Sequence, residues 1–215
     1  MDHDLNTVKT ASRKPAGYHH GDLRAALIRA AEEVIRERGV DGFSLREAAR
    51  RAEVSAAAPT HHFGDARGLL TAVAVEGFRD LCAALAAADA RSARDGASRV
   101  ERLRAQGRAY VAYALAEPAR FDVMWRKGRI DTSDAAYITA AARAFELLCA
   151  AVEDRPAAPE GQPGATSGDA RVIASWSMVH GFARLALDGV FGSGAGAAEA
   201  AAEALLPAVL ERLDA

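Results

Sequence analysis

The sequence predicts an all-α protein of about nine helices, with an N-terminal domain of three helices followed by a larger helical domain. Three observations support this prediction. Alanine, the strongest helix former, dominates the apolar residues. Apolar residues recur at helical spacing along most of the chain, and no segment shows the alternation of a half-buried strand. Half of the 215 residues are hydrophobic and 26% are charged, so the chain can bury a core.

The first expected helix runs from Asp22 to Arg38. Asp22 is a candidate N-cap, and Gly39 stands where a residue of left-handed conformation would end the helix. Glu32 and Glu33 are expected to face solvent. The apolar face of this helix is formed by Leu23, Leu27, Ala30 and Val34.

Two short helices are expected next. Ser44 and Glu47 have the spacing of a capping box and begin the first of them. Glu53 and Val54 form a turn, and Ser55 is expected to cap the second. Two short helices joined by a tight turn and braced by a preceding helix form a helix-turn-helix, whose second helix can lie in the major groove of DNA.

The remainder is expected to consist of longer helices. A helix capped by Asp65 reaches about Ala90, and a short helix follows Pro118. Pro207 is expected to kink the last helix. The Pro- and Gly-rich segment 155–168 is expected to be a mobile loop. The other expected helices cover about residues 97–116, 133–153, 169–190 and 197–213.

Charge and composition divide the chain into three expected parts: a basic arm at 1–20, the helix-turn-helix domain at 21–81, and a helical domain at 82–215. The arm contains no acid between Leu5 and Gly21, although a solvated tail is an equally open interpretation of its first dozen residues. Its basic and titratable residues are Lys9, Arg13, Lys14, His19 and His20.

Several classes of protein are not supported by the sequence. No transmembrane span or secretory signal is expected, which favours the cytoplasm. Cys82 and Cys149 are expected to be small buried residues, with a redox pair as the alternative. Enzymatic motifs such as a nucleophile elbow, a phosphate loop or zinc-ligand spacing are not found, so neither a cofactor nor a metal is expected.

The run LREAARRAEVSAAAPTHHFGDARGLLTAV gives the domain a family resemblance. Residues 23–81 resemble the DNA-binding domain of the tetracycline-repressor (TetR) family. The shared features are an Ala-x-x-Ala-x-Val-Ser turn, a short recognition helix ending in His-x-Phe, and a following Leu-Leu helix. Trp176, His180 and Gly181 resemble the Trp-His-Gly signature of one C-terminal class of that family. Glu53 and Ala66 depart from the pattern, since the family usually has Gly and often has Lys there.

The resemblance implies a DNA-binding regulator, usually a repressor released from a near-palindromic operator by a small apolar or aromatic inducer. It also implies a homodimer formed through the last two helices, acting in the cytoplasm at the nucleoid. An activator of the same fold, or a helical ligand-binding protein, is the alternative. The residues expected at the DNA are Lys14, Tyr18, His19, Ser44, Arg46, Ser55, Ala56, Ala57, Thr60, His61, His62 and Arg67. Those expected at the ligand are Tyr113, Phe121, Met124, Trp125, Trp176, His180 and Phe182.

Overall fold

A computed structural model describes residues 20–159 and 168–214 of the protein. Within these ranges the chain forms nine α-helices and no strand, which confirms the all-α prediction. A 3-10 turn, Glu211–Asp214, ends the described chain. The helices are α1 (His20–Arg38), α2 (Leu45–Arg51), α3 (Ala58–Phe63), α4 (Ala66–Arg94), α5 (Arg99–Ala116), α6 (Pro118–Trp125), α7 (Ala135–Glu153), α8 (Ala170–Leu187) and α9 (Ala197–Leu210).

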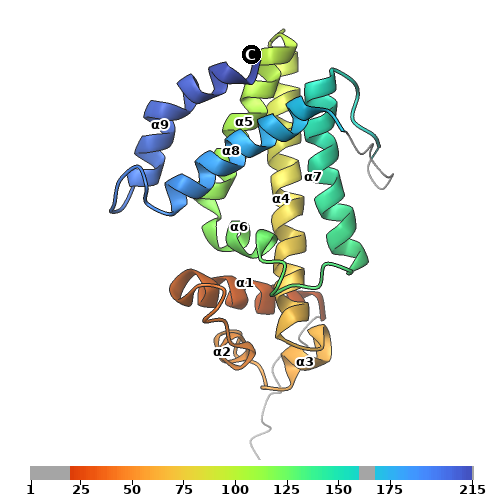
Figure 1. The fold of residues 1–215 in the computed structure, drawn as a ribbon. Coiled ribbons are helices and arrows are strands. Elements are labelled where there is room, and N and C mark those ends of the chain that lie inside the picture. Colours follow the sequence, from red (N-terminus) through yellow and green to blue (C-terminus); the bar gives the residue numbers. More distant parts are fainter. Residues whose placement is uncertain (1–19, 160–167, 215) are drawn as a thin grey trace, which may run out of the picture.

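The helices form a small head and a larger body that share one long helix (Figure 1). The head consists of α1, α2, α3 and the beginning of α4. In the body, α4 packs against α5, α6 and α7, while α8 crosses α5 and contacts α9. The short helix α6 lies at the base of the body and contacts α1 of the head. It is therefore placed to connect the two parts.

The helix ends in the head agree only partly with the sequence. Helix α1 begins at His20, two residues before the expected cap at Asp22, and it ends before Gly39, whose φ of +70° is left-handed as predicted. The Ser44 hydroxyl accepts a bond from the Glu47 amide, as a cap should. The prediction that Ser55 caps α3 is wrong. Helix α3 begins at Ala58 with no side-chain cap, because the Ser55 carbonyl accepts the first turn's hydrogen bond instead.

In the body, α4 begins at its expected cap and runs past its expected end near Ala90, and α5 begins at a serine cap that was not predicted. The Asp65 carboxylate accepts a bond of 2.9 Å from the Gly68 amide and begins α4, which continues to Arg94. Ser98 begins α5 with a complete capping box. Pro207 lies near the end of α9. Most of the expected mobile loop, residues 160–167, lies outside the described residues.

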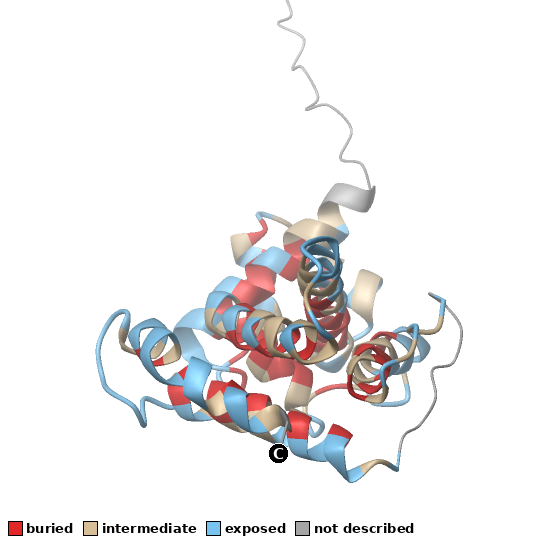
Figure 2. Cartoon of the chain, turned by 90° about the horizontal axis from the view of Figure 1, so that it is seen from above, coloured by how far each residue is buried: buried red, intermediate tan, exposed pale blue. Residues whose placement is uncertain are grey.

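One buried cluster extends from the head into the body along α4. Seen from above, the buried residues gather between the helices and the exposed ones lie around them (Figure 2). The cluster includes Leu27 and Val34 of α1, Phe78 of α4, and Phe121 and Met124 of α6, and the last two side chains are fully buried. Packing of this kind resists independent movement, because interiors are close-packed and transmit strain. The expected boundary at residue 81 falls inside α4, which both parts share.

Helix α7 is, among the described residues, the one helix with the length and apolar composition to cross a membrane. It packs along α4 and contacts α8 in the bundle, and its buried face includes Tyr137 and Cys149. This is the position of a core helix. Cys149 is fully buried and Cys82 is half-buried.

Candidate functional site

The head contains the expected helix-turn-helix. Ala48 and Ala49 of α2 are buried and small, which allows α3 to cross closely, and Val54 packs against the core from the turn. Glu53 has φ +55°, so the turn places a residue other than glycine in the left-handed conformation. A non-glycine residue in this conformation costs about 1–2 kcal/mol.

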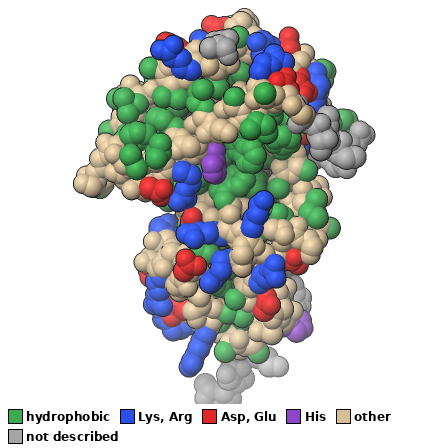
Figure 3. All heavy atoms as spheres, viewed as in Figure 1, with side chains coloured by type: hydrophobic (Ala, Val, Ile, Leu, Met, Phe, Trp, Pro, Cys, Tyr) green, Lys and Arg blue, Asp and Glu red, His purple; other side chains and the backbone are tan. Residues whose placement is uncertain are grey.

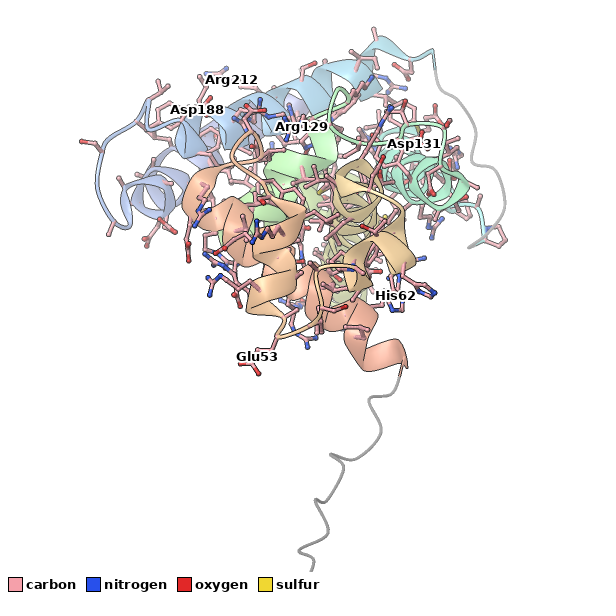
Figure 4. The ribbon with its side chains drawn as sticks, turned by 90° about the horizontal axis from the view of Figure 1, so that it is seen from below. Glu53, His62, Arg129, Asp131, Asp188 and Arg212 are labelled. Carbon is pink, nitrogen blue, oxygen red and sulfur yellow. The ribbon has the colours of Figure 1, made fainter. Side chains whose placement is uncertain are left out.

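The outer face of α3 and of the turn before it is open to solvent. Seen from below, Glu53 and His62 lie at the periphery of this face (Figure 4). Exposed residues on it are Ser55, Ala56, Ala57, Thr60 and His61. His62 is half-buried, as is Ser44, while Arg46 of α2 is exposed. Lys14, Tyr18 and His19, expected in the arm, lie outside the described residues.

Ion pairs within the head hold two arginines of α2. The Arg51 guanidinium binds both Glu37 and Glu47, and only 14% of its side chain is exposed. Arg50 also binds Glu47, at 2.8 Å. Hydrogen bonds from Arg50 and Arg51 lower the pKa of Glu47 to about 2. The Glu47 carboxylate is therefore turned toward these cations, although the predicted capping box would direct it to the backbone of Ser44. The Arg51 side chain is likewise held against the head and largely withdrawn from solvent.

Arg67 lies at the start of α4 and reaches toward the body. Its Nε donates a hydrogen bond of 2.9 Å to the Ile130 carbonyl, in the segment between α6 and α7. One turn later the Thr71 hydroxyl accepts a bond of 2.8 Å from the Asp131 amide. These bonds tie the head to the body. Contact of Arg67 with a DNA phosphate stays a prediction.

The body encloses a cavity of about 600 Å³ between α4, α5, α7 and α8. Its walls are mostly apolar, and a pocket of this size and character suits a small ligand. Figure 3 shows hydrophobic side chains around a histidine in the body of the molecule. The aromatic and histidine side chains of the wall are Phe78, Tyr110, Trp125, Tyr137, Phe145, Trp176 and His180.

Three of the seven side chains expected at the ligand line this cavity: Trp125, Trp176 and His180. The other four pack elsewhere. The Tyr113 hydroxyl donates to the Gly77 carbonyl at 2.8 Å, and Phe182 packs on Phe191. Phe121 and Met124 have no exposed surface and fill the core.

Most other lining residues are absent from the expected ligand set, among them Gln106, Tyr110 and Phe145. Gln106 and Tyr110 are four residues apart and share a face of α5, so helical spacing could have found them together.

A polar relay connects three of the lining side chains. The Tyr110 hydroxyl lies 2.8 Å from His180 Nδ1. Burial raises the pKa of Tyr110, while a hydrogen bond from Trp176 opposes this shift. Burial also lowers the pKa of His180, with the nearby Arg184 charge adding to the effect. Since an indole N–H can only donate, Trp176 is the donor toward the Tyr110 oxygen, while the direction of the bond between the Tyr110 hydroxyl and the neutral His180 is set by the histidine tautomer.

Helix α6 connects this cavity to the head. Its last residue, Trp125, forms part of the cavity wall. Its Arg120 donates from Nε to Glu32 of α1 at 2.7 Å, and Glu32 is buried. The expectation that Glu32 faces solvent is therefore wrong, because α6 covers it, whereas Glu33 is exposed as expected. Just after α6, Arg129 donates to the Val40 carbonyl at 3.1 Å.

Family comparisons agree with both halves of this architecture. Residues 27–73 match the family described as bacterial regulatory proteins, tetR family. Residues 103–209 match the tetracyclin repressor-like C-terminal domain. This protein belongs to the TetR family. It is accordingly a transcription regulator and not an enzyme. The finer resemblance of Trp176, His180 and Gly181 to a Trp-His-Gly class stays a prediction.

Individual relatives extend the comparison. The HTH-type transcriptional regulator BetI of Burkholderia thailandensis is 40% identical over 89 residues, which are 41% of this chain and 42% of that protein. The chain thus spans less than half the length of this curated relative. A solved protein of unknown function from Rhodococcus sp. RHA1 is 33% identical, with a TM-score of 0.68 over 92% of this chain and 96% of that one. AibR in complex with isovaleryl coenzyme A and operator DNA shares the fold, with 19% identity and a TM-score of 0.61 over 86% and 97% of the two chains.

Proposed function

We propose that this TetR-family regulator binds a near-palindromic operator as a homodimer and represses transcription there. A small apolar or aromatic molecule in the cavity releases it. The observation that carries the proposal is the double attachment of α6. Trp125 of α6 lines the cavity, while Arg120 of the same helix is bound to Glu32 of the head. The fold supports it as well, since AibR, of the same fold, was solved with both a ligand and operator DNA.

The DNA contact falls on the exposed face of α3. Thr60 and His61 project from it and can hydrogen-bond to base edges, while Ala56 and Ala57 can contact thymine methyl groups. Because α3 has no long polar side chain, the shape of the DNA and the basic arm should contribute much of the selectivity. Such a regulator acts in the cytoplasm, at the nucleoid.

In the proposed homodimer, the second copy of the chain would pack against α8 and α9 of the first. Five of the large hydrophobic side chains that remain exposed lie on these helices and on the loop between them, and Figure 3 shows hydrophobic side chains gathered over this region. Apolar patches of this kind mark interaction surfaces. The five side chains are Ile173, Leu185, Val190, Phe191 and Leu205.

Coupling between the two sites would pass through α6. The Arg184 guanidinium of α8 binds Asp122 of α6 at 3.2 Å, and Arg126 at the end of α6 lies 3.6 Å from Asp41 of the head. A ligand that displaces Trp125 would shift α6 and, through these pairs and Glu32, the position of α1. Ligand and DNA then lower each other's affinity by the same factor. We also assign the body to the Trp-His-Gly class, because Trp176 and His180 both face the ligand cavity.

Selection of genomic DNA fragments with purified full-length protein tests this function. We expect a near-palindrome whose half-sites lie about one helical turn, 34–36 Å, apart. Leu205→Asp should produce monomers in sedimentation and weaken operator binding. Ile138→Asp is the matched control, because Ile138 is 51% exposed, against 44% for Leu205, but lies on α7. Absence of sequence preference, or tight operator binding by a monomer, would contradict the proposal.

A further inference from the structure

Two polar side chains are buried in the wall of the apolar cavity. Gln106 of α5 is 7% exposed and Ser175 of α8 is 5% exposed, and both line the cavity. Within the described parts of the chain, neither the Gln106 amide nor the Ser175 hydroxyl makes a side-chain hydrogen bond, and neither group is fully enclosed as the unpartnered Trp125 Nε1 is. Their polar atoms therefore reach the open space of the cavity, and a ligand that displaces water there leaves each of them with its full desolvation cost unless it bonds to them. A ligand that fills the cavity should thus offer hydrogen bonds to these two groups.

The two side chains lie at the same level of the paired helices α5 and α8. About one turn before them, Leu103 and Val172 belong to one small buried cluster. After them, a Cβ placed on Gly107 would lie 3.3 Å from Val179 Cγ1, and Tyr110 bonds to His180. The order of these contacts places Gln106 opposite the Ser175 turn. They can therefore reach the same ligand group.

Among the described residues, the rest of the cavity wall offers no competing buried charge. Tyr110, Trp176 and His180 are occupied by the relay, and His180 is neutral because burial lowers its pKa. Lys127 also lines the cavity, but it is exposed to solvent. An anionic ligand would lose its hydration without gaining a buried cation.

A second cavity, of about 550 Å³, also borders Gln106. Among the described residues, its arginines are matched in number by carboxylates. Arg102 binds Asp89, and Arg155 binds Glu146 and Glu153. The arginines of this wall are Arg99, Arg102, Arg143 and Arg155, and the carboxylates on it or bound to it are Asp89, Asp154, Glu146 and Glu153. The second cavity therefore supplies no net charge for an anion.

We propose that Gln106 and Ser175 bind the head group of an uncharged apolar ligand. A carboxamide both donates and accepts, and so does a hydroxyl, so the ligand's head should do both, with primary amide or hydroxyl as the simplest forms. This inference rests on the proposed function, because it takes the cavity as the ligand site. It narrows the ligand from any apolar molecule to a neutral one with a hydrogen-bonding end.

The protein without ligand gives the first test. Gln106→Met keeps the length of the side chain and replaces an amide that has no partner in the protein by an apolar group, so the melting temperature of the full chain should stay equal or rise. Ser175→Ala should likewise be neutral or stabilising, with Ser92→Ala on α4 as its control. A fall in melting temperature for Gln106→Met would show that the amide is bonded within the protein and would overturn the proposal.

Binding of three matched probes gives the second test: 4-phenylbutanamide, butylbenzene and the 4-phenylbutyrate anion. Both tryptophans of the chain line the cavity, so their fluorescence reports binding. Gln106→Met should weaken the amide about 3- to 10-fold, the equivalent of one net hydrogen bond, and leave butylbenzene unchanged or tighter. Of the three probes, the anion should bind the wild-type protein most weakly.

The outcomes separate the inference from the function. Equal effects of Gln106→Met on the amide and butylbenzene, or tightest binding of the anion, would overturn the inference and leave the cavity as the ligand site. If none of the probes binds the wild type, the cavity is not a ligand site, and the ligand-release part of the proposed function fails with the inference.

Discussion

Glu32 of the head and Arg120 of the body form an ion pair with 2.7 Å between Oε1 and Nε. The side chains are 8% and 20% exposed, so water screens this pair poorly. Arg120 also binds Asp80 of α4, which places one guanidinium between α1, α4 and α6. Any shift of α6 must stretch or rearrange this contact. The interaction energy of the pair therefore reports how strongly the head is coupled to the cavity.

Arg120→Met should lower the free energy of unfolding by about 3–5 kcal/mol, because it leaves the buried Glu32 carboxylate without its cation. The double variant Glu32→Gln with Arg120→Met should recover part of that loss. Urea unfolding of the wild type, of each single variant (Glu32→Gln and Arg120→Met) and of the double variant gives the coupling energy between the two side chains. Arg79→Met is the control, since Arg79 pairs with Glu76 on the exposed side of α4 and should cost at most about 1 kcal/mol. Equal losses for Arg120→Met and Arg79→Met would contradict a coupling role.

Deletion of residues 1–17 should weaken operator binding and flatten its salt dependence. The segment between Leu5 and Gly21 is basic and contains no acid, so we expect it to bind phosphates or the minor groove. For every phosphate that the shortened protein no longer neutralises, the slope of log K against log salt should fall by about 0.9. Fluorescence anisotropy over a salt series measures it, and an unchanged slope would reject the arm as a DNA-binding segment.

Substitutions on the head should separate base contacts from phosphate contacts. Thr60→Ala and His61→Ala should weaken binding to the selected operator more than to random DNA, because both side chains are exposed on α3. Arg67→Ala should weaken both about equally, since phosphate contacts carry no base information. If Arg67→Ala changes neither affinity but lowers stability, its bond to the Ile130 carbonyl is its whole role.

Acid should unfold the head partly through Glu47. Hydrogen bonds from Arg50 and Arg51 lower its pKa from 4.5 to about 2 in the folded protein. The stabilisation is complete above the unfolded value near 4.5 and is lost as the pH falls toward 2. Glu47→Gln should therefore flatten the melting temperature between pH 4.5 and pH 2, as measured by circular dichroism, with Glu203→Gln on the exposed side of α9 as control. An unaltered profile would show that the ion pairs do not persist in solution.

Local patterns predicted the helices well, because caps and breaks act over a few residues. Asp65 and Gly39 stand where the structure begins or ends a helix, and the left-handed conformation of Glu53 follows from the place of glycine in related turns. Ser55 does not cap α3 with its side chain, because a serine before a helix can satisfy the first turn with its carbonyl alone. The correct predictions and the incorrect one for Ser55 all concern hydrogen bonds within a single turn of the chain.

Tertiary contacts were beyond these patterns. Glu32 is four residues before the exposed Arg36 on the same helix, so the helical pattern predicts that it faces solvent. It is buried because α6 packs over it. Phe121 and Trp125 are also four residues apart on α6, yet one fills the core and the other lines the cavity. Which of two neighbouring large side chains borders a void depends on α8 and α5, and helical spacing does not contain that information.

Trp125→Ala should change ligand response more than stability. The indole is half-buried, lines the cavity, and lies edge-on to His180 with 4.8 Å between ring centroids. Since part of its surface already faces a void, its removal should cost less than the roughly 3–5 kcal/mol typical of a buried tryptophan. Operator binding should survive, while release by a ligand that acts on the wild type should disappear.

Phe121→Ala is the matched control for this last change, because Phe121 is one turn earlier on α6 and has no exposed surface. It should incur the full loss of about 3–5 kcal/mol in urea unfolding. The comparison depends on the same helix bearing both residues, so a general weakening of α6 would affect both variants alike. If Trp125→Ala destabilises the protein as much as Phe121→Ala and leaves the ligand response normal, Trp125 is a core residue, and α6 must sense the ligand through another contact.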